Sequence, residues 1–349
     1  MLTTIVAAII VLGGLIFFHE LGHFTVARWL GMGVSTFSLG FGPKLLKYRH
    51  GKTEYALSLV PLGGYVALVG ENDENDIPSG FTREECFSLR PAWQRFLVIA
   101  AGPFANILLA CGGSPIMSDE PEDVEDITSI CGGLNINIGT LNQRSIEGMF
   151  RAGAKANALG HVVLLDPVGA GASALRTNTA VELMEKIKFT VIRGNISEIK
   201  TLALGSGTTK GVDADVADAV TDANLDSAVK FVKDFAAKSG AIVAVTGAID
   251  LVSDGTACYV IRNGRPEMGK ITGTGCQLSA LTAAFITANP GQPLEAAAAA
   301  VCAMGLAGEI AHARLTPLDG NATYRNYIID AIYHMTPAQL EEGAKYEVR

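Results

Sequence analysis

The sequence has 349 residues, few charged side chains and no excess of basic ones. Charged residues make up 18% of the chain, and 27 lysines and arginines are outnumbered by 35 aspartates and glutamates. The formal net charge is −8. Proteins that bind nucleic acid neutralise phosphates with clustered basic side chains. This balance therefore argues against nucleic acid as a partner.

The cysteines lack a pattern. No pair has the spacing of a metal-binding motif. A chain of this length can bury a core without disulfide bonds, so reduced thiols in a cytosolic setting are the default expectation. The six cysteines are Cys86, Cys111, Cys131, Cys258, Cys276 and Cys302.

Charge is also absent from the first 18 residues. This run lacks the basic start and the small-residue cleavage site of a secretory signal peptide. A helix over residues 2–18 would be about 26 Å long, slightly shorter than a bilayer core of ~30 Å. Apolar residues up to Trp29 can extend it. Basic residues gather between Arg28 and Lys52, which predicts a transmembrane helix followed by a cytoplasmic loop.

Two different patterns follow. Residues 36–70 combine apolar alternation with glycines and predict short strands or a hairpin, partly in contact with the membrane. The apolar stretch 96–110 predicts a second helix, interrupted at Gly102-Pro103. From Ser114 onward, short apolar strands alternate with helical stretches, which is typical of a parallel sheet covered by helices.

From Ser114 onward, the sequence also predicts where several helices, strands and turns begin or end. Asp254-Gly255 predicts a hairpin turn, and Pro293 predicts the first turn of a long alanine-rich helix. The other predicted elements are strands over 134–138, 162–165, 190–192 and 242–245, and helices over 143–159, 225–238 and 278–288.

His19, Glu20 and His23 form an HExxH motif. One helical turn separates the two histidines, so both could bind one Zn²⁺, and Glu20 could take a proton from a metal-bound water. The alternative is a helix end with a few polar residues. Ionisable side chains in an apolar helix are costly and usually functional, which favours the zinc interpretation.

The first 110 residues resemble the site-2 protease family of intramembrane zinc proteases. That resemblance implies that His19 and His23 bind zinc and that Glu20 is the general base. The family's third zinc ligand is an aspartate on a later transmembrane helix, and the Asp319-Gly320 pair here lies in a polar stretch instead. We therefore expect zinc to bind weakly if at all. The motifs that carry the resemblance are HELGHF (19–24), FGP (41–43), PLGGYV (61–66) and RPAWQRFLVIAAGPFAN (90–106).

A second constellation suits phosphate transfer. Residues 273–276, Gly-Thr-Gly-Cys, lead into a predicted helix, where backbone N–H groups and the helix dipole could bind a phosphate. Taken alone, this could be an ordinary helix cap. Polar residues also follow the predicted strands, at the edge where α/β proteins bind ligands. Asp166 and Glu198 suit hydrated Mg²⁺, Arg193 suits a phosphate, and Thr246 suits a hydrogen bond to a nucleotide.

Residues 105–349 resemble the hydroxyethylthiazole kinase family. The resemblance implies a ribokinase-like α/β fold, with helices on both faces of one sheet. It also implies transfer of phosphate from ATP to the hydroxyl of 4-methyl-5-(2-hydroxyethyl)thiazole, a salvage step towards thiamine. The matching motifs are ANILLACGGSPIM (105–117), NIGTL (137–141), LLDPVGAGAS with RT (164–177), IRGNISEI (192–199), KGVD (210–213), AVTGAID (244–250) and TGTGC (272–276).

The kinase resemblance assigns roles to single residues. ATP would bind at Arg193 and Thr246, magnesium at Asp166 and Glu198, and the thiazole near Met117 and the backbone of Gly273. Cys276 occupies the position at which many relatives of the fold have an aspartate base. A thiol is a poor base unless the helix N-terminus lowers its pKa, and the alternative is a small buried hydrophobe. The family forms homotrimers.

We therefore expect two parts, a truncated protease-like region over 1–104 and a kinase domain over 105–349. The first would anchor the chain in the membrane, and the second would act in the cytoplasm on a small molecule. The alternatives are an incomplete intramembrane zinc protease, or a non-catalytic fusion or assembly artefact. Residues 105–110 fit both resemblances, and we expect the helix containing residues 106–110 to pack on the kinase sheet rather than to cross the membrane.

Overall fold

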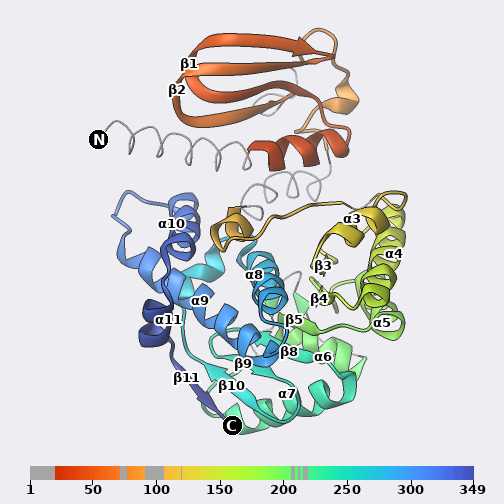
Figure 1. The fold of residues 1–349 in the computed structure, drawn as a ribbon, viewed down its shortest axis with the longest axis vertical. Helices are drawn as coiled ribbons and strands as arrows, with labels where there is room; N and C mark the ends of the chain where they lie inside the picture. The colour runs from red at the N-terminus through yellow and green to blue at the C-terminus, as the bar shows by residue number, and fades with distance from the viewer. Residues whose placement is uncertain are drawn as a thin grey trace. The chain divides into compact units, whose positions relative to one another are not determined.

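The computed structural model describes residues 20–70, 77–90, 106–118, 120–205, 209–210, 213–214 and 219–349. The chain divides into two compact units, one ending at Leu109 and the other beginning at Ala110 (Figure 1). The predicted helix over 2–18, the metal-ligand candidate His19 and most of the predicted helix over 96–110 lie outside the described residues.

The amino-terminal unit contains the predicted hairpin. Residues 20–29 are helical. Strands β1 (Val34–His50) and β2 (Thr53–Leu68) pair in antiparallel fashion along their length, with several register shifts. Phe24 of the helix packs edge-on against Phe37 of β1, with 5.2 Å between ring centroids. The 3₁₀ turn η1 (Arg83–Glu85) follows the hairpin.

The carboxy-terminal unit is built on one seven-stranded sheet with the order β11-β10-β9-β8-β5-β4-β3. The four strands at the β3 end are parallel, and the three at the other end are antiparallel. A separate two-stranded pair joins β6 (Thr209–Lys210) to β7 (Asp213–Ala214). The strands of the large sheet are β3 (Gly133–Asn137), β4 (Val162–Asp166), β5 (Val191–Asn195), β8 (Ile242–Thr246), β9 (Asp250–Ser253), β10 (Cys258–Ile261) and β11 (Tyr346–Val348).

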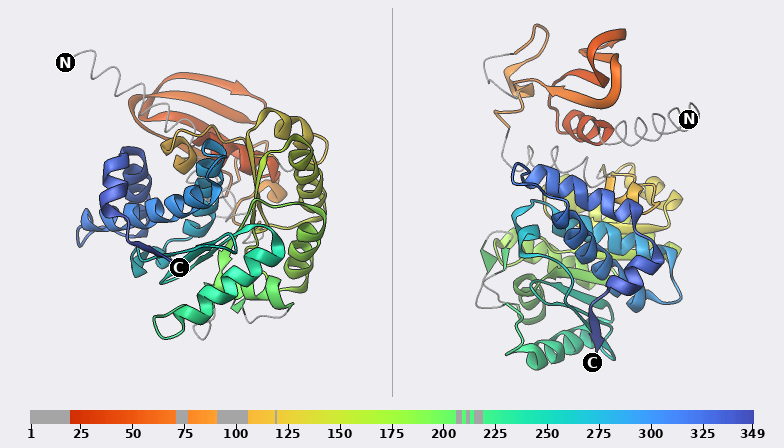
Figure 2. Two further views of the ribbon diagram at one scale, coloured as in Figure 1. Left: turned by 60° about the horizontal axis from the view of Figure 1, so that its bottom comes forward. Right: turned by 90° about the vertical axis from the view of Figure 1, so that its left-hand side faces the viewer.

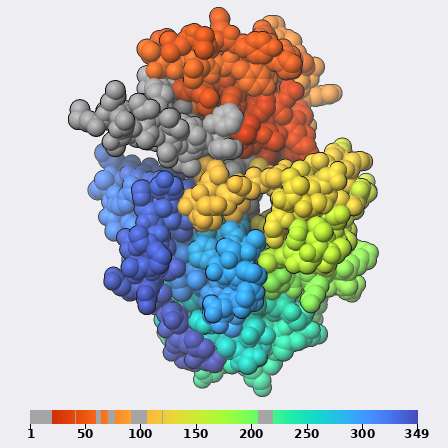
Figure 3. All heavy atoms as spheres, in the orientation of Figure 1, coloured from red at the N-terminus to blue at the C-terminus, as the bar shows by residue number. Residues whose placement is uncertain are grey.

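Helices cover both faces of this sheet (Figure 2). Helices α4, α6 and α7 pack on one face, and α8 and α9 pack on the other. Residues from the carboxy-terminal part of the chain, drawn in blue, form much of the face of this unit that Figure 3 shows. The helices are α3 (Val124–Ile130), α4 (Gln143–Leu159), α5 (Ala174–Lys186), α6 (Ile196–Leu204), α7 (Leu225–Ser239), α8 (Thr274–Ala288), α9 (Pro293–Ala313), α10 (Asn321–His334) and α11 (Pro337–Gly343), with the 3₁₀ turn η3 (Pro266–Lys270).

Small residues allow close packing against the sheet. Helix α4 buries Gly148, Ala152 and Ala156, and α9 is rich in buried alanines. Within the described part of the chain, α9 alone has the length and apolar composition that could suit a membrane crossing. Its most apolar window is 78% buried inside the unit, as in the core helix of a globular domain.

The sequence predictions for this unit are confirmed, with small shifts at the ends. All four predicted strands are present, and three of them extend by one to three residues at their carboxyl ends. The helix predicted over 143–159 has those bounds, and the one over 225–238 is one residue longer. Asp254-Gly255 lies in the turn between antiparallel β9 and β10, and Pro293 begins α9. The helix predicted over 278–288 begins earlier, at Thr274.

Candidate active site

The alternation of the parallel strands places four polar side chains on one face of the sheet. Successive residues of a strand point to opposite faces. Ile136, Leu165, Ile192 and Val245 belong to the apolar core beneath α4 to α7. The next residue of each strand therefore points toward the opposite face, at the carboxyl end. These next residues are Asn137, Asp166, Arg193 and Thr246.

Asp166 ends β4 and is completely buried. Its Oδ2 accepts hydrogen bonds from Nδ2 of Asn137 and from Oγ of Ser279 on α8, each 2.8 Å long. Its Oδ1 has no hydrogen-bond partner and lies 3.8 Å from Nη1 of Arg193. Burial raises the pKa of this carboxyl group, while Arg193 and hydrogen bonds from Ser279, Asn137 and Cys276 act in the opposite direction.

Glu198 is held by two backbone N–H groups. It is the third residue of α6, and its Oε2 accepts from the N–H of Asn195 at 2.8 Å, in a reciprocal capping arrangement. Its Oε1 accepts from the N–H of Gly169, in the loop after β4, at 2.7 Å. Burial, together with the negative charge of Asp166, raises the pKa of Glu198 to about 7. The two carboxyl groups are therefore close enough to influence each other.

Arg193 lies between these carboxylates and the amino-terminal end of α8. Its Nη2 donates a 2.6 Å hydrogen bond to Oγ1 of Thr246, at the end of β8. Its Nε is buried and has no hydrogen-bond partner. A Cβ on Gly275 would lie only 2.8 Å from Nη1 and 3.1 Å from Nη2, so the absence of a side chain there makes room for the guanidinium.

Of residues 273–276, which the sequence placed before the helix, only Gly273 precedes α8, and the other three form the first turn of the helix. Gly273 has a φ of +90°, which favours glycine, and its carbonyl accepts the hydrogen bond from the N–H of Gln277. The N–H groups of the first helical residues have no acceptor within the helix. Burial and the nearby Asp166 raise the pKa of the Cys276 thiol to about 12, while a hydrogen bond with Asn137 acts to lower it. The thiol is therefore protonated at neutral pH, and the helix N-terminus does not activate it.

Comparisons with known proteins match the carboxy-terminal unit. The model of the "Hydroxyethylthiazole kinase family" matches residues 98–338. The hydroxyethylthiazole kinase of Clostridium acetobutylicum is 61% identical over 243 residues, which cover 70% of this chain and 89% of that protein. This chain belongs to the hydroxyethylthiazole kinase family. The corresponding protein of Clostridium tetani is 42% identical over 241 residues, which cover 69% of this chain and 86% of the relative.

A solved structure supports the same assignment. The hydroxyethylthiazole kinase of Pyrococcus horikoshii OT3 superposes with a TM-score of 0.62 at 32% identity, covering 70% of this chain and 88% of that one. The expectation of a ribokinase-like α/β fold is thus confirmed for the carboxy-terminal unit. The family match begins at residue 98 and does not test the resemblance of the earlier residues to the site-2 protease family.

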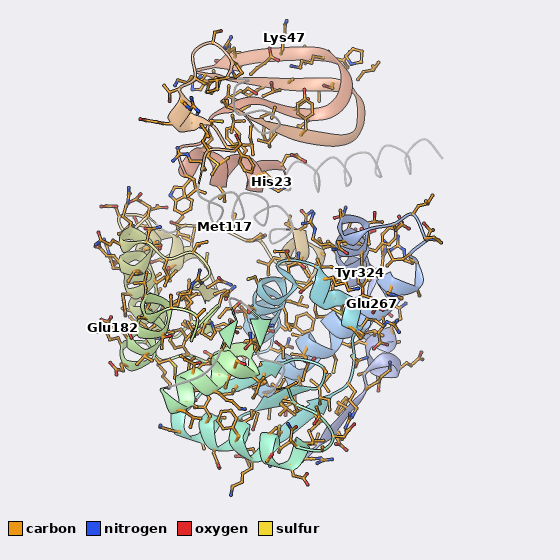
Figure 4. All side chains as sticks on the ribbon, turned by 180° about the vertical axis from the view of Figure 1, so that it is seen from behind. His23, Lys47, Met117, Glu182, Glu267 and Tyr324 are labelled. Carbon is orange, nitrogen blue, oxygen red and sulfur yellow. The ribbon has the colours of Figure 1, made fainter. Side chains whose placement is uncertain are left out.

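In this family member, the structure brings together most of the residues that the sequence singled out. Asp166, Glu198, Arg193, Thr246 and Cys276 are linked by the hydrogen bonds and electrostatic contacts described above. Met117 lies on the segment that precedes α3 and is 42% exposed; it is labelled in Figure 4.

The sequence patterns did not single out two residues of this site, Asn137 and Ser279. Asn137 was part of a matching motif, and its place at the end of a strand is the same signal that pointed to Asp166. Ser279 follows Gly275 by one helical turn and so faces the same side of α8. Its hydrogen bond to Asp166 joins residues 113 positions apart, which no local pattern could indicate.

The amino-terminal motif is described only in part. Glu20 and His23 lie on the helix over residues 20–29, and His23 is labelled in Figure 4. Across the described ranges there is no group of three or more histidine, cysteine, aspartate or glutamate side chains arranged to hold a metal ion. Because His19 is outside those ranges, the weak zinc site stays a prediction.

Proposed function

We propose that this chain transfers the γ-phosphoryl group of ATP to the hydroxyl of 4-methyl-5-(2-hydroxyethyl)thiazole, a salvage step towards thiamine. The supporting observation is the cluster of Asp166, Glu198, Arg193 and Thr246 beside the amino-terminal end of α8, in a member of a kinase family. Phosphoryl transfer depends mainly on positioning and electrostatic stabilisation, and this cluster can supply both.

The two carboxylates suit magnesium. Both are buried oxygen donors, which Mg²⁺ prefers. Oδ1 of Asp166 has no hydrogen-bond partner and lies 3.8 Å from Nη1 of Arg193, so it is placed to accept a cation. The positive charge of Arg193 acts on both carboxyl groups and lowers the pKa of each. Magnesium, when bound, would supply positive charge to the phosphate oxygens.

The nucleotide and the thiazole would lie on either side of this centre. We assign the phosphates of ATP to Arg193, Thr246 and the N–H groups at the start of α8, because these donors converge at one end of the sheet. We assign the thiazole to the neighbourhood of Met117 and the backbone of Gly273. Cys276 would contact the alcohol as a neutral thiol, since a pKa of about 12 leaves almost no thiolate at pH 7.

The decisive experiment uses the full chain in detergent or membranes. ATP, Mg²⁺ and the thiazole alcohol are supplied, and the phosphate ester is detected by mass spectrometry. The expected result is one ester formed per ADP released, with both lost in Asp166→Ala. A matched control is Asn157→Ala, because Asn157 makes two hydrogen bonds to the backbone of Lys188, before β5 begins. Folded protein that phosphorylates a different alcohol would contradict the substrate but not the reaction class.

We further propose that the amino-terminal helix anchors the chain in the membrane, with the kinase unit in the cytoplasm as a homotrimer. A tag after Arg349 that outside reagents label in intact cells would contradict this placement. His19 and His23 supply two zinc ligands, whereas stable sites need three or four, so purified protein should hold far less than one zinc per chain. Stoichiometric zinc that is lost in His19→Ala would overturn this view.

A further inference from the structure

We propose that Arg176 is a positioning residue that fixes two loops whose hydrogen bonds orient the magnesium carboxylates, Asp166 at the end of β4 and Glu198 on α6. This inference rests on the proposed function, because it concerns the same site. Arg176 is the third residue of α5. Its guanidinium donates three hydrogen bonds to backbone carbonyls, from Nη1 to Ile138 at 3.0 Å and Val168 at 2.7 Å, and from Nη2 to Gly139 at 2.8 Å.

Those carbonyls belong to two different loops. Ile138 and Gly139 follow β3, and Val168 follows β4. One planar group therefore joins the ends of two adjacent parallel strands. The N–H of Ile138 also donates to the carbonyl of Asp166 at 3.1 Å, so the two loops are connected from both sides.

Each of the two loops held by Arg176 makes a hydrogen bond that helps to orient one of the two carboxylates. The N–H of Gly139 donates to Oδ1 of Asn137 at 2.8 Å, and the same amide donates from Nδ2 to Asp166. The N–H of Gly169, the residue after Val168, donates to Glu198. A shift of the Arg176 side chain would thus move a donor of Glu198 and the amide that orients Asp166.

Arginine is suited to this position for physical reasons. Its planar fork offers five N–H donors in fixed directions, whereas lysine offers one compact ammonium group. Burial lowers the pKa of Arg176, and the negative charge of Glu198 acts to raise it. The backbone of Arg176 is fixed as well, since Ser173 caps α5 by accepting from the N–H of Arg176.

The test compares Arg176→Ala and Arg176→Lys with Lys186→Ala, which removes an exposed cation from the same helix. We expect Arg176→Ala to lower kcat about 10- to 100-fold, as the loss of residues that orient metal ligands typically does. The magnesium concentration for half-maximal rate should rise, and KM for the thiazole should change little. Added guanidinium should restore part of the rate in Arg176→Ala but none in Asp166→Ala.

A purely structural role would produce a different pattern. Arg176→Ala would then lower the melting temperature without changing the magnesium dependence, and guanidinium would not restore the rate. Either result would overturn the proposal. If Arg176→Ala does not fold, Arg176→Lys must show the shifted magnesium dependence, and wild-type dependence in that variant would also overturn it.

Calorimetry separates this inference from the proposed function. Binding of Mg²⁺ with a non-hydrolysable ATP analogue requires no turnover of the thiazole. If the wild-type chain binds this complex but ignores the thiazole, the substrate assignment fails alone. If Arg176→Lys and wild type bind it with the same magnesium dependence, the role of Arg176 fails, whatever the alcohol is.

Discussion

The side-chain amide of Asn137 donates a 2.8 Å hydrogen bond to Oδ2 of Asp166, across two neighbouring parallel strands whose register pairs these residues. Ser279 donates to the same oxygen. Asn137 and Ser279 therefore both bind Oδ2, and Oδ1 faces the guanidinium of Arg193. This arrangement orients the carboxylate so that one oxygen stays available to a cation.

A substitution at Asn137 should therefore damage catalysis more than folding. We expect Asn137→Ala to lower kcat about 10- to 100-fold, because Asp166 loses the amide that orients it. Asn137→Asp should be worse, since it adds a second carboxylate beside a buried one. The measurement is steady-state kinetics at saturating ATP and magnesium.

Asn157→Ala is the matched control for this prediction. Asn157 also makes two hydrogen bonds through its amide, to the N–H and carbonyl of Lys188, but these lie before β5 begins. Equal loss of kcat in Asn137→Ala and Asn157→Ala would show that general destabilisation explains both, and would contradict a specific role for Asn137.

Gly275→Ala should separate activity from stability. The added Cβ would meet Nη1 and Nη2 of Arg193 at 2.8 and 3.1 Å, so the guanidinium must move away from its place near Thr246. Alanine is a better helix former than glycine, and Gly275 lies in the first turn of α8, so the melting temperature should not fall. KM for ATP should rise about 10- to 100-fold, since displaced contacts commonly cost that much.

Gly269→Ala provides the comparison for this variant. Gly269 lies in η3, and a Cβ there would meet no atom within 4 Å. Its KM for ATP should equal that of the wild type. A Gly275→Ala protein with wild-type KM would mean that Arg193 does not contact the nucleotide.

The sequence alone indicated much of this site because its signals are local. Asp166 and Thr246 end apolar strands, Arg193 follows the apolar residues of β5, and the alternation of those strands predicts their common face. Which strands are neighbours is not local information. Strand β5 pairs with β8, about 50 residues later in the chain, and only that pairing brings Arg193 to Thr246.

The start of α8 shows the same limit. Glycines are poor helix formers, so the sequence favoured a helix that begins after Cys276. The structure begins the helix at Thr274, because Gly273 in a left-handed conformation caps it there. The three carbonyls that accept hydrogen bonds from Arg176 could not be predicted either, because every residue has a backbone carbonyl and the sequence does not indicate which ones bind a side chain.

Cys276→Ala should retain most of the activity. Burial and the nearby Asp166 hold the pKa of this thiol at about 12, so it is protonated at neutral pH and cannot act as a base from the thiolate form. We expect kcat to fall by well under the ~100-fold that loss of a general base typically costs. Slow alkylation by iodoacetamide at pH 7, compared with the unfolded chain, would support the same conclusion. A loss of kcat larger than that of Asp166→Ala would contradict it.

The last prediction concerns pH. Burial and Asp166 raise the pKa of Glu198 from 4.5 to about 7, so the folded chain binds this proton more tightly than the unfolded chain does. In metal-free protein, the resulting stabilisation is fully present below pH 4.5 and is lost as the pH rises through about 7. Magnesium favours the ionised carboxylate, so it should weaken this dependence, and in its presence kcat should fall on acidification only at a pH below the metal-free pKa of about 7.

Melting temperatures of wild type and Glu198→Gln, measured from pH 5 to pH 8 with chelator present, test this prediction. The glutamine does not titrate, so the melting temperature of the wild type should fall relative to that of the variant as the pH rises across this range. Glu182→Gln on α5 removes an exposed carboxylate and controls for the change of net charge (Figure 4). Added magnesium should reduce the pH-dependent difference in melting temperature between wild type and Glu198→Gln. It should not change the difference between wild type and Glu182→Gln. A difference that stays constant with pH would show that Glu198 is ionised throughout, and that Arg193 and the two backbone donors outweigh its burial.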